Sequence, residues 1–203
     1  GMGGHKAGDY ASETIAQCLA DLHLNDDLGE CVDRIEDSLQ EVNDHLRQHA
    51  RVNCDGNTVG STVVVLVNRG EVGVAQWAGD SRLYRKRGRH MQQITRDHNP
   101  IVDQLENGLI SEEEALATDT NIMTRAVGGQ HDLLLDVAVF DICPGDTMLL
   151  CTDGLYREVE AQGLFDALQG NVDDAVDTLM RHCLDGEARD NVSIVVARAG
   201  AAA

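Results

Sequence analysis

The sequence predicts an α+β fold in which two antiparallel β-sheets pack on each other and helices flank their outer faces, an α-β-β-α sandwich of four layers. Two observations support this. The segments run in the order helices, strands, helices and a final strand, which is typical of segregated layers. The chain of 203 residues with 42% hydrophobic side chains is long enough to bury a sizeable core. We therefore expect a single domain over residues 1–203.

Two amphipathic helices are expected near the N-terminus. After a glycine-rich stretch over residues 1–8, apolar residues form a stripe at Ala11, Ile15, Leu19 and Leu22. A second stripe, with alternating steps of three and four, consists of Val32, Ile35, Leu39, Val42 and Leu46.

The middle of the chain has the pattern of strands. Residues 61–67 are continuous and rich in β-branched side chains, which predicts a strand buried on both faces. Further strands are expected at 72–78, 83–86 and 90–94, and together they read as one antiparallel meander interrupted at residues 79–82.

The second half begins with a polar region without strand character, which we interpret as a surface insertion. Pro100 starts a short helix there, and Ser111 opens another with a capping box. The remaining elements are strands at 133–140, 147–151 and 191–197, and helices at 164–168 and 172–183.

Composition limits the partners and the location. The net charge of −19 argues against nucleic acid or an anionic membrane as partner, because both require Lys and Arg to neutralise phosphates. No apolar run approaches the ~18 residues of a membrane span, and no signal peptide opens the chain. The six cysteines form no CxxC pair, so we expect reduced core thiols in a cytoplasmic protein.

The apolar run of residues 149–151 leads through Thr152 into Asp153 and Gly154. An interior strand would hold the Asp153 carboxylate rigidly at its end, and the glycine would let the backbone turn. A simple turn cap is the alternative interpretation, since Asp-Gly is a common turn pair.

Similar Asp turns recur at Asp80 and Asp190, and a glycine loop opens the chain at Gly1. Each turn alone is more often structural than functional. Carboxylates that converge from neighbouring strand ends would repel unless they shared cations, and Mg²⁺ or Mn²⁺ takes such oxygen ligands. Two such ions about 3.5–4 Å apart can deliver hydroxide to a phosphoryl group. The Gly-Asp turn at Asp146 precedes its strand, so we assign it to structure.

An ordered set of motifs resembles the metal-dependent protein phosphatase 2C (PPM) family, and most of all its compact bacterial Ser/Thr phosphatases. The resemblance covers residues 1 to about 197 and implies the family's β-sandwich. It rests on Gly-Met-Gly-Gly-His at 1–5, Gly60-Ser61-Thr62, Gly79-Asp80-Ser81-Arg82, Thr95-Arg96-Asp97-His98, Thr124-Arg125-Ala126-Val127-Gly128, Cys151-Thr152-Asp153-Gly154 and Asp190-Asn191.

This resemblance implies a role for each matching residue. Asp153 and Asp190 would hold a core pair of Mn²⁺ or Mg²⁺ ions, and the backbone carbonyl of Gly1 would bind one of them. Asp80 and Asp153 would hold a third, weaker ion, and Asn191 would support Asp190 from behind. No side chain would act as nucleophile, because a metal-bridging water has that role. Residues of about 98–125 would form the flap beside the site.

The implied activity is hydrolysis of phosphomonoesters on Ser/Thr phosphoproteins, the products of a bacterial Ser/Thr kinase. The alternatives are a regulatory or binding module of the same fold and, less favoured by the motif set, an acidic scaffold whose Asp turns are only turns. The family's bridging Asp before Gly1 and its first strands have no counterpart in this sequence. We therefore expect an N-terminally truncated chain with weak or no activity. If Gly1 is an added residue before an initiator Met2, the match of Gly1 to the family is accidental.

Overall fold

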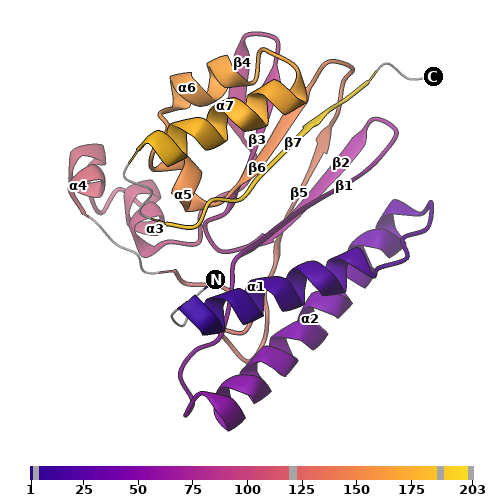
Figure 1. Cartoon of the computed structure of the whole chain (residues 1–203), viewed down its shortest axis with the longest axis vertical. Helices are drawn as coiled ribbons and strands as arrows, with labels where there is room; N and C mark the ends of the chain where they lie inside the picture. The colour runs from indigo at the N-terminus through magenta and orange to yellow at the C-terminus, as the bar shows by residue number, and fades with distance from the viewer. Residues whose placement is uncertain (2–4, 119–122, 187–189, 201–203) are drawn as a thin grey trace. The chain divides into compact units, whose positions relative to one another are not determined.

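The computed structural model describes residues 1, 5–118, 123–186 and 190–200. Figure 1 shows their arrangement into helices and strands. In chain order the elements are α1 (His5–Ala20), α2 (Leu28–Asn53), β1 (Val63–Arg69), β2 (Val72–Ala78), β3 (Arg82–Arg87), β4 (His90–Gln93), α3 (Pro100–Glu106), α4 (Glu112–Ala117), β5 (Asp136–Asp141), β6 (Thr147–Cys151), α5 (Asp153–Tyr156), α6 (Ala161–Ala167), α7 (Val172–Asp185) and β7 (Ile194–Arg198).

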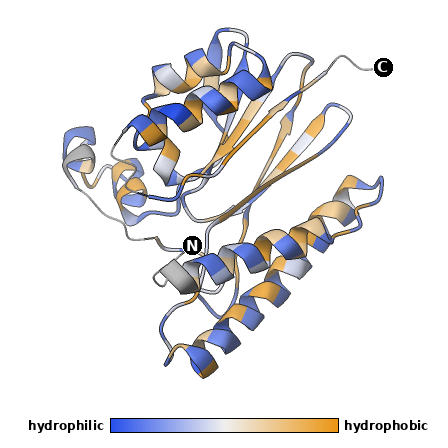
Figure 2. Ribbon diagram, in the orientation of Figure 1, coloured by the Kyte–Doolittle hydropathy of each residue, from blue (hydrophilic) through white to orange (hydrophobic). Residues whose placement is uncertain are grey.

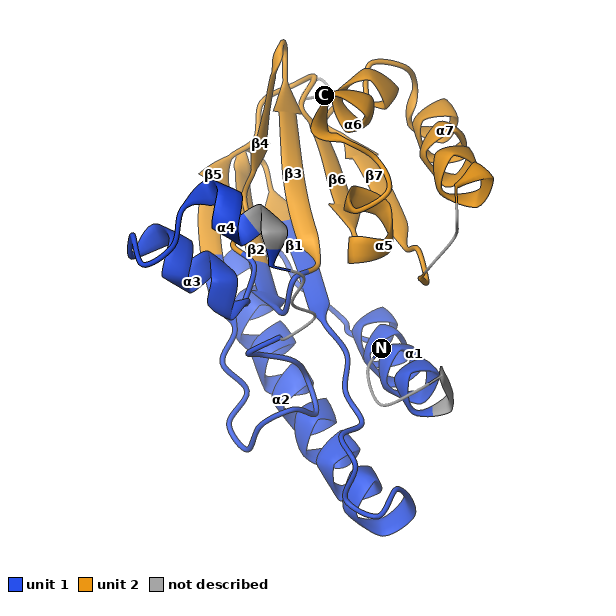
Figure 3. Ribbon diagram, turned by 90° about the vertical axis from the view of Figure 1, so that its left-hand side faces the viewer, with its two compact units in different colours: residues 1–67, 76–80, 97–137 blue, residues 68–75, 81–96, 138–203 orange. Residues whose placement is uncertain are grey.

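The chain divides into two compact units, which we describe separately (Figure 3). The first comprises residues 1–67, 76–80 and 97–137, and the second comprises residues 68–75, 81–96 and 138–203. The single domain expected from the length of the chain remains a prediction.

The strands form two antiparallel sheets flanked by helices, which confirms the predicted α+β class. One sheet has the order β1-β2-β5 and the other β4-β3-β6-β7. The prediction of one meander over residues 61–94 is wrong, because β1–β2 and β3–β4 belong to different sheets. The chain leaves the first sheet at Gly79, whose φ of +114° lies where only glycine is comfortable and where a regular strand cannot continue.

The prediction that residues 61–67 are buried on both faces is also wrong. β1 begins at Val63 and lies at an edge of its sheet, so Val64, Val65 and Leu66 are only partly buried while Val63 and Val67 are buried. A continuous run of β-branched residues does not distinguish a central strand from an edge strand of this kind.

The first unit contains the long helix α2 with α1 beside it (Figure 1). The hydrophobic stripes of both helices are visible in Figure 2, and their predicted members Ala11, Ile15, Ile35 and Leu39 are buried. The side chain of Asp27 caps α2 by accepting the amide hydrogen of Glu30 at 3.0 Å. The two helices therefore bury their hydrophobic stripes, as the spacing predicts.

Asn43 is a buried polar residue on the apolar face of α2, where the helical pattern gave no sign of it. Its side chain donates to the carbonyl oxygens of Gln130 and His131 at 3.1 and 3.2 Å, and it accepts the amide hydrogen of Gly128 at 2.8 Å. Because all three partners belong to the loop before β5, Asn43 fixes that loop on the helix.

The described part of the predicted flap consists of α3 and α4. Asn99 caps α3 by accepting the amide hydrogen of Ile101, and Pro100 occupies the first turn. Ser111 and Glu114 form the predicted capping box of α4. Residues 119–122, which the prediction includes in the flap, lie outside the described residues.

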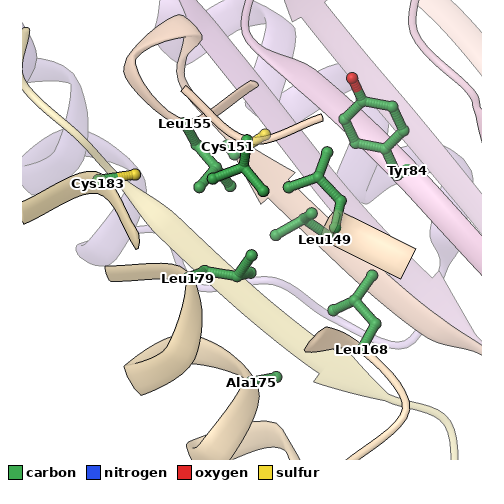
Figure 4. Close-up of a cluster of buried hydrophobic side chains, with 10 residues drawn as sticks. Tyr84, Leu149, Cys151, Leu155, Leu168, Ala175, Leu179 and Cys183 are labelled. Carbon is green, nitrogen blue, oxygen red and sulfur yellow. The ribbon is translucent and has the colours of Figure 1, made fainter. Parts of the chain in front are cut away.

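The core of the second unit gathers around β6, an interior strand of the four-stranded sheet. Leu149 and Cys151 of β6 point toward Leu179 of α7 and Leu155 of α5 (Figure 4). The pairing of Leu149 with Tyr84 on β3 and with Val196 on β7 fixes the register on both sides. The predicted interior strand before Asp153 is therefore confirmed, and it is bonded to a neighbour along each edge.

All six cysteines are free, and Cys31, Cys151 and Cys183 are buried. Burial raises the pKa of the Cys183 thiol, so this sulfur stays protonated. Across the residues that the structure describes, every helix is too short or too polar to cross a bilayer.

Candidate metal centre

Asp153 is the first residue of the short helix α5, directly after β6. The sequence pattern predicted a turn at this point, and the helix was not expected. Gly154 therefore has a different role from the predicted one, because it is helical and does not have a positive φ. A Cβ atom at residue 154 would lie 2.5 Å from the carbonyl oxygen of Asn191, so the missing side chain permits a close approach of two backbone segments.

Thr152 reinforces this contact from the other side. Its hydroxyl donates to the carbonyl oxygen of Asn191 at 3.3 Å and accepts the amide hydrogen of Ser193 at 3.0 Å. The Thr152 amide also donates to the Ser193 carbonyl at 3.2 Å. The backbone after β6 and the backbone before β7 are thus tied together at the sheet end that carries Asp153.

Asp190 lies next to this junction and is exposed. Its carboxylate accepts the backbone amide hydrogen of Asn191 at 2.7 Å. This hydrogen bond uses the backbone of Asn191 and not its side chain, so the predicted support of Asp190 by Asn191 stays a prediction. The structure brings the segments of Asp153 and Asp190 side by side, and this pairing carries the candidate site.

The carboxylate of Asp153 is 24% exposed and forms an ion pair with Arg157 one turn further along, at 3.3 Å. Helix α5 is braced from β3 by Arg82, whose guanidinium lies 3.6 Å from the centre of the Tyr156 ring. Arg82 also donates to the hydroxyl of Tyr84 at 2.9 Å. Arg82 thus contributes to the support of the helix that starts with Asp153.

Asp80 and Gly1 lie in the first unit. Asp80 is half-buried and follows Gly79, while Gly1 is exposed at the start of the chain. The backbone of Gly1 lies against Gly8, since a Cβ atom at either position would overlap the other residue. Residues 2–4 of the glycine motif and residues 187–189 before Asp190 lie outside the described residues.

The donors of the candidate site suit a hard divalent cation. Asp153 and Asp190 offer carboxylate oxygens, the ligands that Mg²⁺ and Mn²⁺ prefer. Within the described ranges, however, no group of three or more His, Cys, Asp and Glu side chains is arranged to hold an ion. The chemistry of the donors fits such a metal, whereas their number is smaller than a pair of ions requires.

The chain belongs to the protein phosphatase 2C family, whose model matches residues 1–192. At the level of the family it is a protein serine/threonine phosphatase. Serine/threonine phosphatase stp of Listeria welshimeri is 30% identical over 203 residues, which are 97% of this chain and 81% of that protein.

Solved structures agree with this assignment. PppA, described as a key regulatory component of T6SS in Pseudomonas aeruginosa, is 36% identical with a TM-score of 0.88, over 98% of this chain and 83% of that one. The catalytic domain of the phosphatase PstP in complex with two manganese ions is 29% identical with a TM-score of 0.84, over 97% of this chain and 84% of that one. The predicted family is confirmed.

Proposed function

We propose that this domain is a cytoplasmic hydrolase of signal transduction that removes phosphate from phosphoserine and phosphothreonine in proteins. This proposal rests mainly on the close approach of the Asp153 and Asp190 segments, which Gly154 permits and Thr152 stabilises. Backbone segments that are tied together at the end of a sheet give their carboxylates a rigid base from which to bind cations. Manganese in the related PstP domain supports Mn²⁺ as the ion, with Mg²⁺ as the second choice.

Each residue of the proposed site has a separate task. Asp153 and Asp190 would hold the core pair of ions, Asn191 would keep Asp190 oriented through its amide, and the Gly1 carbonyl would add a neutral oxygen. Asp80 and Asp153 would hold a third ion. When bound, the divalent cations lower the pKa of a water and stabilise the charge on the phosphoryl oxygens. No side chain of this chain is assigned as nucleophile.

The substrates are proteins phosphorylated by a bacterial Ser/Thr kinase. The family membership and the named phosphatase relatives support this class of substrate. The net charge of −19 supports the further proposal that neither nucleic acid nor an anionic membrane is a partner.

Low activity is proposed for the 203-residue chain by itself. The two carboxylates of Asp153 and Asp190 supply few ligands for a pair of ions, and the described residues contain no cluster of three His, Cys, Asp or Glu side chains. A regulatory module of the same fold that binds phosphoproteins without turnover is the second candidate, and this shortage of ligands favours it. The presence of Asp80, Asp153, Asp190 and Asn191 together favours the enzyme.

The test is release of phosphate from a phosphothreonine peptide with Mn²⁺, measured for the chain and for Asp153→Asn. We expect slow hydrolysis by the chain and a loss of about 100-fold or more in Asp153→Asn, because the variant lacks the charge that holds the ions. The matched control is Asp177→Asn, which removes the same charge from an exposed position on α7. It should hydrolyse the peptide at the rate of the unmodified chain. Equal rates in the chain and in Asp153→Asn would refute the enzymatic proposal, and peptide binding without any turnover would favour the regulatory module.

A further inference from the structure

His98 lies between β4 and α3, and it is tied to one residue by two hydrogen bonds. Its amide donates to the carbonyl oxygen of Gly79 at 3.0 Å, and its ring nitrogen Nδ1 accepts the amide hydrogen of Gly79 at 3.0 Å. The imidazole is 3% exposed and is stacked nearly parallel to the Trp77 ring, with an angle of 13° between them. Gly79 is therefore held at both of its backbone polar groups by one buried residue.

The hydrogen bond at Nδ1 fixes the tautomer of the His98 ring. Because Nδ1 accepts a hydrogen bond, the ring proton of neutral His98 resides on Nε2, which lies 3.1 Å from the carboxylate of Asp136. Arg125 binds the other carboxylate oxygen of Asp136. Burial raises the pKa of Asp136, but His98 and Arg125 outweigh that effect and lower it, so the carboxylate stays charged and keeps the ring oriented.

Gly79 needs this support because its backbone is unusual. Its φ is +114°, and a Cβ atom there would lie 2.3 Å from the Thr62 side chain. The next residue is Asp80. The orientation of the peptide between Gly79 and Asp80 therefore sets the direction in which the Asp80 side chain leaves the backbone. The amide of Thr124 also donates to the His98 carbonyl at 2.9 Å, which links the end of the flap to the same residue.

We propose that His98 is a positioning residue that sets the Gly79–Asp80 backbone, and through it the reach of the Asp80 carboxylate toward a divalent cation. This inference rests on the proposed role of Asp80 as a ligand of the third ion. Asp136 and Arg125 act indirectly, because Asp136 orients the ring of His98 and Arg125 binds Asp136. All of these contacts lie within the first unit.

Two substitutions distinguish the contribution of Nδ1 from that of Nε2. In His98→Asn the amide oxygen takes the place of Nδ1 and can still accept the Gly79 hydrogen. In His98→Gln the amide reaches the place of Nε2 and loses the contact with Gly79. Both variants remove the imidazole, so a general effect of lost packing should be similar in the two.

We expect His98→Gln to weaken Mn²⁺ binding by about 10-fold at the Asp80-dependent site, and His98→Asn to change it by less than about 2-fold. The free Mn²⁺ is followed by electron paramagnetic resonance during titration of the full 203-residue chain. Hydrogen exchange of the Gly79 amide should speed up in His98→Gln only. Equal behaviour of the two variants in both measurements would overturn the proposal.

The same titration in an Asp80→Asn background tests whether His98 acts through Asp80. There His98→Gln should have no additional effect on Mn²⁺, and an undiminished effect would overturn the proposal. If Asp80→Asn alone left the titration unchanged, the assignment of Asp80 as a ligand in the proposed function would fall, and this inference with it. If Asp80→Asn weakened binding and His98→Gln did not, only the role of His98 would fall.

A measurement on the unmodified chain does not depend on how the variants fold. A nitrogen–nitrogen coupling through the hydrogen bond between the Gly79 amide and His98 Nδ1 should be detectable by nuclear magnetic resonance. A His98 ring that carries its proton on Nδ1 in the neutral state would overturn the proposal.

Discussion

At the scale of single residues, Gly154 is the position where the smallest change has a clear consequence. Gly154→Ala places a methyl group 2.5 Å from the Asn191 carbonyl and 3.1 Å from the Val192 side chain. We expect it to cost about 1–3 kcal/mol in the free energy of unfolding, because the two backbones must separate. Phosphatase activity with Mn²⁺ should fall as well, since Asp153 and Asp190 would move apart.

Gly170→Ala is the matched control for this substitution. Its added Cβ atom would meet its nearest neighbour, the Cβ of Asp174, at 3.9 Å, an ordinary contact. Urea unfolding and phosphate release should separate the two variants. A Gly154→Ala protein as stable and as active as the parent would contradict the close approach described for this residue.

Asp146 shows that an Asp turn can be entirely structural, as its place before β6 indicates. It accepts hydrogen bonds from Arg87 Nε and Nη2 at 2.8 and 2.7 Å and from the Cys143 amide at 2.9 Å, and its side chain is 1% exposed. Asp146→Asn should therefore cost about 2 kcal/mol in stability at neutral pH. Asp141, the exposed second partner of Arg87, serves as the control, and Asp141→Asn should cost less.

The contribution of Asp146 should also depend on pH. The hydrogen bonds from Arg87 lower the pKa of Asp146 despite its burial. A carboxylate with a lowered folded pKa stabilises the protein above its unfolded pKa of about 4, and this contribution disappears as the pH falls through the folded value. The stability difference between the parent and Asp146→Asn should thus shrink below pH 4 in urea titrations, and a constant difference would contradict this account.

At the scale of elements, β6 supports both the core and the candidate site. Leu149 is fully buried between β3, β7 and α7, so Leu149→Ala should cost about 3 kcal/mol in the free energy of unfolding. Val195→Ala on the neighbouring strand β7 is the control, because Val195 is 58% exposed and its loss should be nearly neutral. Thermal unfolding of the two variants is the measurement, and equal melting temperatures would refute the interior position of β6.

Sequence patterns predicted some of these helices and strands and missed others. Helical stripes predicted α1, α2 and α7, and strand patterns predicted β2, β3, β4 and β6, because burial on one face leaves a periodic signal. The short helix α5 has no such period, since four residues make about one turn. The assignment of β1 to a sheet edge depends on partners far along the chain, which a local pattern does not contain.

The candidate site was predictable in part for a similar reason. Asp80, Asp153 and Asp190 follow sequence patterns that are typical of turns, so these residues can be singled out in the sequence, although Asp153 in fact begins a helix. His98 and Thr152 support that site through hydrogen bonds to residues 19 and 41 positions away. Such long-range partners are set by the tertiary fold, and no spacing rule along the chain would have found them.

At the scale of the whole molecule, the surplus of acidic residues should govern the response to salt. The chain has 35 Asp and Glu against 16 Lys and Arg, so its folded state is subject to self-repulsion. Raising NaCl from about 10 mM to about 200 mM screens this repulsion and should raise the melting temperature. A fall in the melting temperature over this range would mean that specific ion pairs, such as Arg87–Asp146, outweigh the repulsion.

The passage of the chain from one sheet to the other at Gly79 has a consequence for the time course of folding. β3 and β4 form a hairpin between near neighbours, whereas Tyr84 on β3 pairs with Leu149 on β6 across 65 residues of chain. Closing such a long loop is entropically costly and slow. We therefore expect the local hairpin to form before the pairing of β3 with β6, which orders the strand end that carries Asp153.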